Sequence, residues 1–229
     1  MKHLLMIRNL THILREHCAY IVVFVVLIVL CISVNADEIE RKGVVSTDAV
    51  TRDFITIGSG TSTQRQPFGM FFGYERSASL YTASEMMYSG LITDMGWYKS
   101  STGTVYCPNV KIYLKMTTDT SLTATTWSSM ISGATTVLNG TPTYFSVNGW
   151  FVFDTTDFIY SNNQNLLVMV ETNYGGTGTS TYPQFRYSSS TSKHQYWAAD
   201  GSAPTGNGTV NDNRPNLIFS MTLSPKFTP

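Results

Sequence analysis

From residue 54 to residue 222, the sequence alternates between short runs of β-branched and aromatic residues and clusters of Gly, Ser, Thr and Asn. The clearest run spans residues 110–116 and reads VKIYLKM, with aliphatic residues and Met at the even positions and Lys or Tyr at the odd ones. A period of two places one set of side chains on each face of a β-strand. This run therefore predicts a strand with one face in a core and the other toward solvent.

Other runs have the same character and predict further strands. They lie at 54–57, 70–74, 79–82, 91–98, 135–138, 143–147, 150–154, 166–171, 185–187, 196–198 and 217–222. One short helical turn is predicted within 123–130, with Trp127 at the edge of the sandwich. Because the strands follow one another without βαβ spacing, we expect an all-β fold: a single antiparallel, jelly-roll-like β-sandwich over residues 54–224, followed by a C-terminal tail at 225–229.

The N-terminal segment has the pattern of an export signal. Lys2, Arg8 and Arg15 precede a nearly unbroken apolar run at 19–34, and small residues follow up to Ala36. This order predicts a signal peptide over residues 1–36, cleaved after Ala36. The alternative is an uncleaved membrane anchor, because about 20 apolar residues span a bilayer. Both interpretations place the remaining chain outside the cell, secreted or at the cell surface, with membrane contact only through this leader.

Residues 37–53 have a different composition, with eight charged residues in seventeen and no sustained period. This pattern predicts a flexible N-terminal arm between the leader and the domain. Its apolar residues Val44, Val45 and Val50 are candidates for an assembly contact, because an extended arm can add a strand to the open edge of a neighbouring copy.

Charge and cysteine content exclude several classes of protein. The formal net charge is zero and only 13% of residues are charged, so there is no electrostatic basis for nucleic-acid binding. Cleavage of the leader would leave Cys107 as the single cysteine, which rules out an intramolecular disulfide in the mature chain. We expect Cys107 to be a small buried residue and the stability of the domain to come from its β core.

Aromatic residues near two turn-rich segments, 174–182 and 200–213, suggest a carbohydrate site. The candidate ligand-binding residues are Tyr182, Tyr187, Tyr196, Trp197 and Asp200. A pyranose ring stacks its C–H face on Tyr or Trp, and its hydroxyl groups bind amide and carboxylate side chains. The alternative is that these aromatic residues pack in the core. Of the tryptophans, Trp197 is the best ligand candidate, and Trp150 is expected in the core.

Metal and catalytic motifs are sparse. Asp154 and Asp157 could bridge a calcium ion at a strand end, although Asp side chains also cap turns. After the leader only His194 and Cys107 could be zinc ligands of the His or Cys type, so no zinc site is expected. His194 lies in a Ser- and Thr-rich run and is expected in a solvated loop, and no Gly-x-Ser-x-Gly motif is present. We therefore expect no enzyme activity and at most a structural calcium ion as cofactor.

Several short motifs, taken in order, resemble a known family. They are IGSGTS at 57–62, YTASE at 81–85, NVKIYLK at 109–115, NGW at 148–150 and NLLVMVE at 165–171. This order is similar to the jelly-roll-like β-sandwich modules of secreted and surface proteins of Bacteroidetes-type bacteria, including gingipain-associated adhesins. The resemblance covers about residues 54–222 and implies an extracellular, non-catalytic module used in adhesion or in binding glycans and host or matrix proteins.

Three functions follow from these observations. The first is an adhesive or structural subunit of a surface assembly or filament, which would have other copies of itself, surface glycans or matrix proteins as partners. Such modules usually accompany protease or fibronectin-like domains, whereas here one module follows the leader, which raises the possibility that it is itself a building block. The second is a carbohydrate-binding module, and the third is a secreted hydrolase that uses paired carboxylates.

Overall fold

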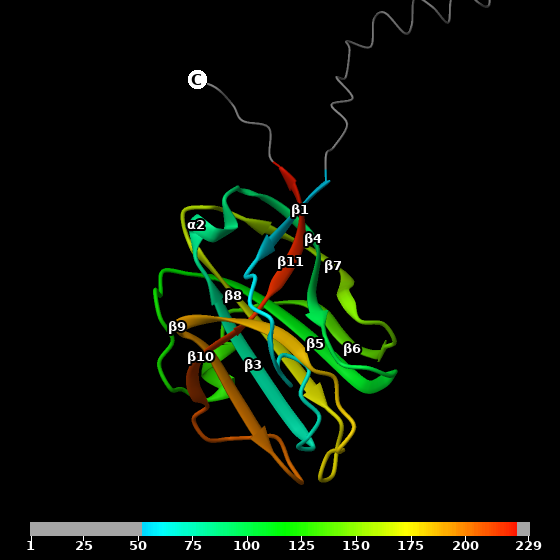
Figure 1. Cartoon of the computed structure of the whole chain (residues 1–229). Coiled ribbons are helices and arrows are strands. Elements are labelled where there is room, and N and C mark those ends of the chain that lie inside the picture. Colours follow the sequence, from blue (N-terminus) through cyan, green and yellow to red (C-terminus); the bar gives the residue numbers. More distant parts are fainter. Residues whose placement is uncertain (1–51, 224–229) are drawn as a thin grey trace, which may run out of the picture. The chain divides into compact units, whose positions relative to one another are not determined.

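The computed structural model describes residues 52–223, and strands dominate this part of the chain (Figure 1). The elements are β1 (Arg52–Ile57), β2 (Ser62–Gln64), β3 (Tyr74–Tyr81), α2 (Ala83–Met86), β4 (Gly90–Lys99), β5 (Val105–Thr117), α3 (Trp127–Met130), β6 (Thr135–Phe145), β7 (Gly149–Tyr160), β8 (Asn165–Asn173), β9 (Phe185–Ala199), β10 (Thr209–Pro215) and β11 (Leu217–Leu223). None of the helices within this range is long and apolar enough to cross a membrane.

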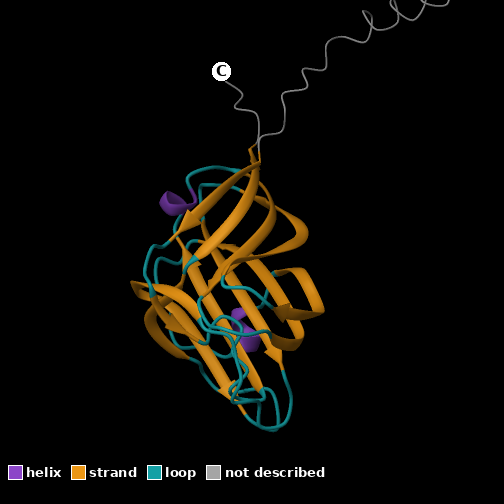
Figure 2. Cartoon of the chain, turned by 45° about the vertical axis from the view of Figure 1, so that its right-hand side comes forward, coloured by secondary structure: helices purple, strands orange, loops and turns teal. Residues whose placement is uncertain are grey.

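The strands form one continuous antiparallel sheet that folds over into two halves (Figure 2). One half has the order β1-β11-β4-β7, and the other has the order β10-β9-β3-β8-β5-β6, with β2 also paired to β9. A single pairing, Lys99 with Phe185, joins β4 to β9 and so connects the halves. The prediction of an all-β, antiparallel, sandwich-like domain is confirmed.

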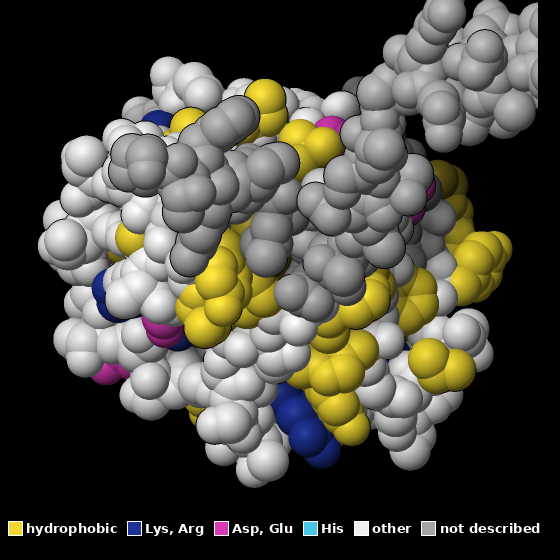
Figure 3. Space-filling model, turned by 90° about the horizontal axis from the view of Figure 1, so that it is seen from above, with side chains coloured by type: hydrophobic (Ala, Val, Ile, Leu, Met, Phe, Trp, Pro, Cys, Tyr) yellow, Lys and Arg dark blue, Asp and Glu magenta, His cyan; other side chains and the backbone are white. Residues whose placement is uncertain are grey.

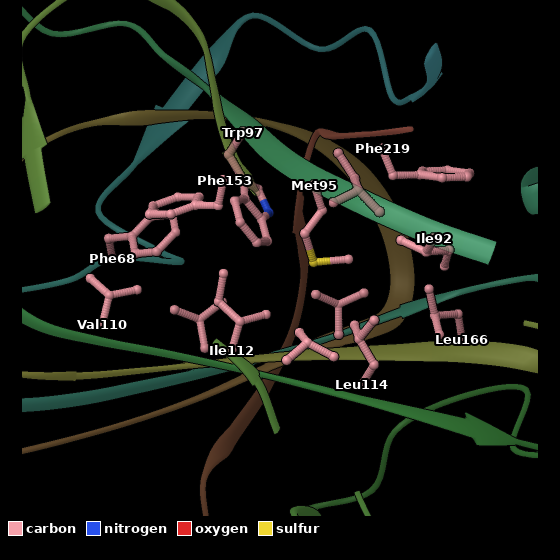
Figure 4. Packing of buried hydrophobic residues seen from close by; sticks show 14 of the residues in the cluster. Phe68, Ile92, Met95, Trp97, Val110, Ile112, Leu114, Phe153, Leu166 and Phe219 are labelled. Carbon is pink, nitrogen blue, oxygen red and sulfur yellow. The ribbon is translucent and has the colours of Figure 1, made fainter. Parts of the chain in front are cut away.

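The main core lies between the two halves (Figure 4). Ile92, Met95 and Trp97 of β4 point toward Val110, Ile112 and Leu114 of β5, as the period of two in 110–116 predicts. Aromatic rings fill the centre: Phe68 lies 5.0 Å from Trp97 between ring centroids, in an edge-to-face arrangement. Cys107 is also in this core, and burial raises the pKa of its thiol to about 12, so it is an inert thiol as expected.

The opposite face of the larger half is also covered. Residues 118–134, which include α3, lie over β3, β8 and β9, and a second hydrophobic cluster fills this layer. Trp127 of α3 packs edge-to-face on Trp197 of β9 at 5.3 Å. This second layer explains the sequence LLVMV at 166–170: this part of β8 is buried on both faces, so its side chains are apolar at each of these five positions.

An ionic network is buried in the second layer. The Glu171 carboxylate accepts hydrogen bonds from Tyr113 Oη, Trp127 Nε1 and Asn173 Nδ2, and lies 3.5 Å from Arg76 Nη2. Burial opposes ionisation of Glu171, but these partners outweigh it and lower the pKa of the carboxyl group. The network fastens α3 to the sheet through Trp127.

Several elements differ from the sequence predictions. Residues 70–73 are irregular and β3 begins only at Tyr74, because Met70 turns into the core while Phe71 is exposed. The predicted strands at 185–187 and 196–198 are the two ends of one long strand, β9. Strands β2 and β10 were not predicted, and Trp150, expected in the core, is half-buried on the outer face against Tyr98.

The start of the folded part also differs slightly. Strand β1 begins at Arg52, two residues before the predicted domain start, because Arg52 and Asp53 already pair with β11. The predicted leader, the rest of the arm with Val44, Val45 and Val50, and the predicted tail all lie outside the described residues.

Candidate functional site

A hollow of about 610 Å³ opens at the C-terminal end of β9. Two regions that are distant in sequence line it: residues 65–72, and the end of β9 together with the following loop into β10. The lining residues are Arg65, Phe71, Phe72, Tyr196, Trp197, Ala198, Ala199, Pro204, Thr205, Gly206, Asn207 and Thr209. The volume lies within the range of roughly 300–1,000 Å³ typical of small-molecule sites.

Arg65 is held in the wall of the hollow by a buried acid. Its Nε donates to Glu75 Oε2 at 2.7 Å, and Glu75 Oε1 accepts a hydrogen bond from the Phe72 backbone N–H at 3.1 Å. The Glu75 side chain is only 1% exposed, whereas that of Arg65 is 27% exposed. Gly69 makes this possible, since a Cβ there would lie 2.2 Å from Glu75 Oε2. The guanidinium is therefore fixed in place, with one side toward solvent.

Three aromatic rings surround the Arg65 guanidinium. Its Cζ lies 5.9 Å from the Phe71 centroid, 5.4 Å from that of Phe72 and 5.9 Å from that of Tyr196. Phe71 is 45% exposed, and Tyr182, which packs against the main core, contacts it edge-to-face at 5.7 Å. The hollow thus presents apolar ring surfaces beside a fixed cation.

The loop into β10 supplies the polar side of the hollow. Gly208 packs flat on the Trp197 indole, where a Cβ would lie 2.4 Å from the ring, and its N–H donates to the Thr125 carbonyl at 2.9 Å. This close approach fixes the loop and places the exposed side chains of Thr205, Asn207 and Thr209 along the hollow. Together the walls offer stacking surfaces, hydroxyl and amide groups, and one guanidinium.

The structure brings together only part of the predicted carbohydrate site. Tyr196 and Trp197 line the hollow, and Tyr182 does not line it but contacts Phe71, which does. Asp200 is exposed next to it and accepts a hydrogen bond from the Gly73 N–H at 3.0 Å. Tyr187 does not line it, because it lies at the other end of β9 between β2 and β10.

The structure places Trp197 in a covered position, unlike the exposed position that a ligand-stacking role would need. Its side chain is on the covered face of β9, 3% exposed, and its Nε1 donates to the Thr125 carbonyl at 2.9 Å. It therefore forms the floor under Gly208 and offers no free ring face for a ligand. The residues that sequence analysis missed are Arg65, Phe71 and Phe72; the signal was the pair of adjacent Phe residues between Gly69 and Gly73, which in an extended chain cannot both face a core.

The candidate calcium ligands are in a different setting from the one predicted. Asp154 and Asp157 are exposed within β7, not at its end. A bulge separates them, since Asp154 pairs with Asp94 but Phe158 pairs with Ile92. Within residues 52–223 no group of three or more His, Cys, Asp or Glu side chains is placed to hold a metal ion.

His194 is also not where the sequence placed it. It is fully buried in β9; its Nε2 lies 3.0 Å from Ser77 Oγ and its Nδ1 lies 2.8 Å from Asn211 Oδ1. Burial lowers the pKa of His194 to about 4, so the imidazole is neutral at pH 7. Although a Ser–His pair suggests nucleophilic chemistry, Ser77 is 1% exposed, and a substrate cannot reach its Oγ in this structure. The pair links β3, β9 and β10.

Comparison with known proteins adds no family assignment. No protein-family model matches the chain, and no curated protein is significantly similar to it. The functional argument therefore depends on the site itself.

Proposed function

We propose that this protein is an extracellular, non-catalytic binding module that acts in adhesion, and that the hollow at the end of β9 holds a carbohydrate. The observation that carries the proposal is the meeting of exposed and half-buried aromatic rings with hydrogen-bonding side chains around one hollow, from two regions that are distant in sequence. Export rests on the leader pattern at residues 1–36.

The composition of the hollow suits a sugar better than a purely apolar ligand. A pyranose has an apolar C–H face, for which Tyr196 and Phe72 offer ring surfaces, and hydroxyl groups, for which Thr205 and Asn207 offer partners. Rigid β9 and the immobilised Gly208 loop hold these groups in advance of binding, which lowers the entropic cost of association.

Binding to immobilised polysaccharides tests the proposal. We expect Tyr196→Ala and Asn207→Ala each to weaken retention about tenfold, which corresponds to the loss of one stacked ring or one hydrogen-bonded contact. Tyr106→Ala is the matched control, because this tyrosine is 42% exposed on β5 outside the hollow. Wild-type protein that binds no polysaccharide in a broad panel, or equal losses in all three variants, would contradict the proposal.

A second candidate function is a structural subunit of a surface assembly. It is favoured by exposed apolar side chains on the outer face of the smaller half of the sheet: Val152 and Ile159 on β7 are 39% and 77% exposed, and Phe54 on β1 is 59% exposed. Figure 3 shows hydrophobic side chains in several groups and few charged ones on the face seen from above. Contact between copies of the chain would remove such side chains from water.

A further inference from the structure

We propose that the ligand of the hollow is an acidic carbohydrate, whose carboxylate binds the Arg65 guanidinium while its ring stacks on the neighbouring aromatic side chains. The inference rests on the proposed carbohydrate-binding function and names the class of sugar. It begins from the placement of Arg65, which the proposed function alone does not require.

Arg65 has unused hydrogen-bonding capacity on the side of the hollow. Glu75 takes the Nε–H, and among the described residues no side chain or carbonyl pairs with the two Nη atoms. A guanidinium carries five N–H donors in a planar fork that matches a carboxylate in two parallel hydrogen bonds. The free Nη donors of Arg65 are therefore available to bind a carboxylate of the ligand.

The buried Glu75 makes Arg65 a rigid partner. Both Glu75 oxygens are occupied, one by Arg65 Nε and one by the Phe72 N–H, so the acid orients the guanidinium without closing off its outer edge. A long flexible side chain usually loses rotamer entropy on binding a ligand. Here Glu75 and the rings of Phe71, Phe72 and Tyr196 already restrict Arg65.

The free Nη donors of Arg65 favour an anionic ligand group, although the Arg65–Glu75 pair as a whole carries no net charge. Arg65 is the only charged residue among those that line the hollow. Asp200 follows the lining residue Ala199 but does not itself line the hollow. Its carboxylate accepts a hydrogen bond from the Gly73 N–H. Aromatic rings lie beside the guanidinium, and apolar surroundings strengthen a charge-assisted hydrogen bond to a ligand. A neutral sugar would leave the Nη donors without an anionic partner.

Two ligands that differ in charge but share the same sugar rings distinguish recognition of the carboxylate from recognition of the ring. We would titrate the purified protein with an oligogalacturonate and with its fully methyl-esterified form, in 50 mM and 500 mM salt. Charge-assisted hydrogen bonds contribute about 1.5–3 kcal/mol, which is about a 10- to 100-fold difference in affinity. The free acid should therefore bind at least about tenfold more tightly than the ester, and the preference should decrease in high salt.

Variants assign the preference to Arg65. Arg65→Gln should abolish the preference for the acid, and Tyr196→Ala should weaken both ligands. Arg65→Gln leaves the buried Glu75 carboxylate without its cation and could destabilise the fold. The double variant Arg65→Gln/Glu75→Gln also lacks the guanidinium but leaves no unpaired buried charge. Arg186→Gln is the control, since Arg186 lies over Tyr98 at 3.9 Å, outside the hollow, and should leave the preference intact.

The outcomes distinguish the two proposals. Equal affinity for acid and ester, or a preference that survives in the double variant, would overturn the assignment to acidic sugars while leaving carbohydrate binding in place. Tight binding of dextran sulfate together with no binding of the oligogalacturonate would also overturn it, because it would indicate sulfate recognition. Absence of binding to every sugar would overturn both proposals.

Discussion

At the scale of single residues, the ion pair between Glu85 and Arg214 makes stability depend on pH. Arg214 of β10 donates from Nη1 and Nη2 to the two Glu85 oxygens, and Glu85 also accepts from the Thr82 N–H in a capping box at the start of α2. Burial alone would raise the pKa of Glu85, but these hydrogen bonds and the Arg214 charge lower it to about 2.

The substitution Glu85→Gln removes the charge and keeps a side chain that can complete the capping box. Because the folded-state pKa lies below the ordinary 4.5, ionised Glu85 stabilises the fold above about pH 4.5, and this contribution is lost as the pH falls toward 2. We expect the variant to be less stable by about 2 kcal/mol at pH 7, a figure reduced for solvent screening of a partly exposed carboxylate.

Thermal unfolding between pH 7 and pH 2 measures this effect. The Tm difference between wild type and Glu85→Gln should be several degrees at pH 7 and should narrow steadily below pH 4.5. Asp157→Asn is the control, because Asp157 is exposed on β7 and its loss should leave the Tm unchanged. A Tm difference that stays constant down to pH 2 would disprove the role of the charge.

The site residues on β9 could not be predicted fully, because the sequence does not show which face of a strand is open to a ligand. The side chains of Tyr196 and Trp197 point to opposite sides of β9, and Gly208 covers the Trp197 ring, so only Tyr196 offers the hollow an open ring face. The sequence does not say which face is covered, because that depends on residues 118–134, which come from elsewhere in the chain. Arg65 was missed for the same reason: its partner Glu75 and its ring neighbours meet only in the folded chain.

At the scale of elements, α3 has a larger role than its four residues suggest. Trp127 is 8% exposed and contacts Trp197 and Tyr113, and its Nε1 donates to Glu171. It therefore fastens the covering segment to the face of the sheet that the smaller half does not reach.

We expect Trp127→Ala to destabilise the domain by about 3–5 kcal/mol, the cost of removing a large buried aromatic side chain. Trp150→Ala is the matched control, since this residue is half-buried on the outer face of β7 and its loss should cost less than half as much. Urea unfolding monitored by far-UV circular dichroism measures both values. Equal destabilisation by the two substitutions would contradict the structural role of α3.

The elements predicted best were those with a clear period or a continuous apolar run, such as β5 and β8. The long β9 was divided in the prediction, because its centre is rich in Ser, Thr and Lys, which resembles a loop. Long-range pairing with β10 at Ser188 and Ser189, and with β3 from His194 onward, brackets this polar centre, and such pairing has no local signal. Likewise, residues 70–73 have strand-like composition but enter the core as an irregular segment.

At the scale of the whole molecule, the domain buries its core between two halves of one sheet and leaves apolar residues on the outer face of the smaller half. If copies associate through this face, sedimentation velocity should reveal species larger than a monomer at micromolar concentration. Ile159→Lys should shift the distribution to monomers, because it places a charge in the contact. Tyr144→Lys is the control, because Tyr144 is exposed on β6, outside this face. A wild-type protein that is purely monomeric would contradict the assembly function.

The fold class follows from composition and period because β-branched runs without helical spacing leave few alternatives to a sandwich. The central functional claim, that the hollow at the end of β9 is a ligand site, is tested most directly by NMR titration of the protein with an oligogalacturonate. The account predicts saturable shifts confined to Arg65, Phe71, Phe72, Tyr196 and the 204–209 loop. Shifts centred on the outer face of β7, or no shifts at saturating sugar, would contradict it.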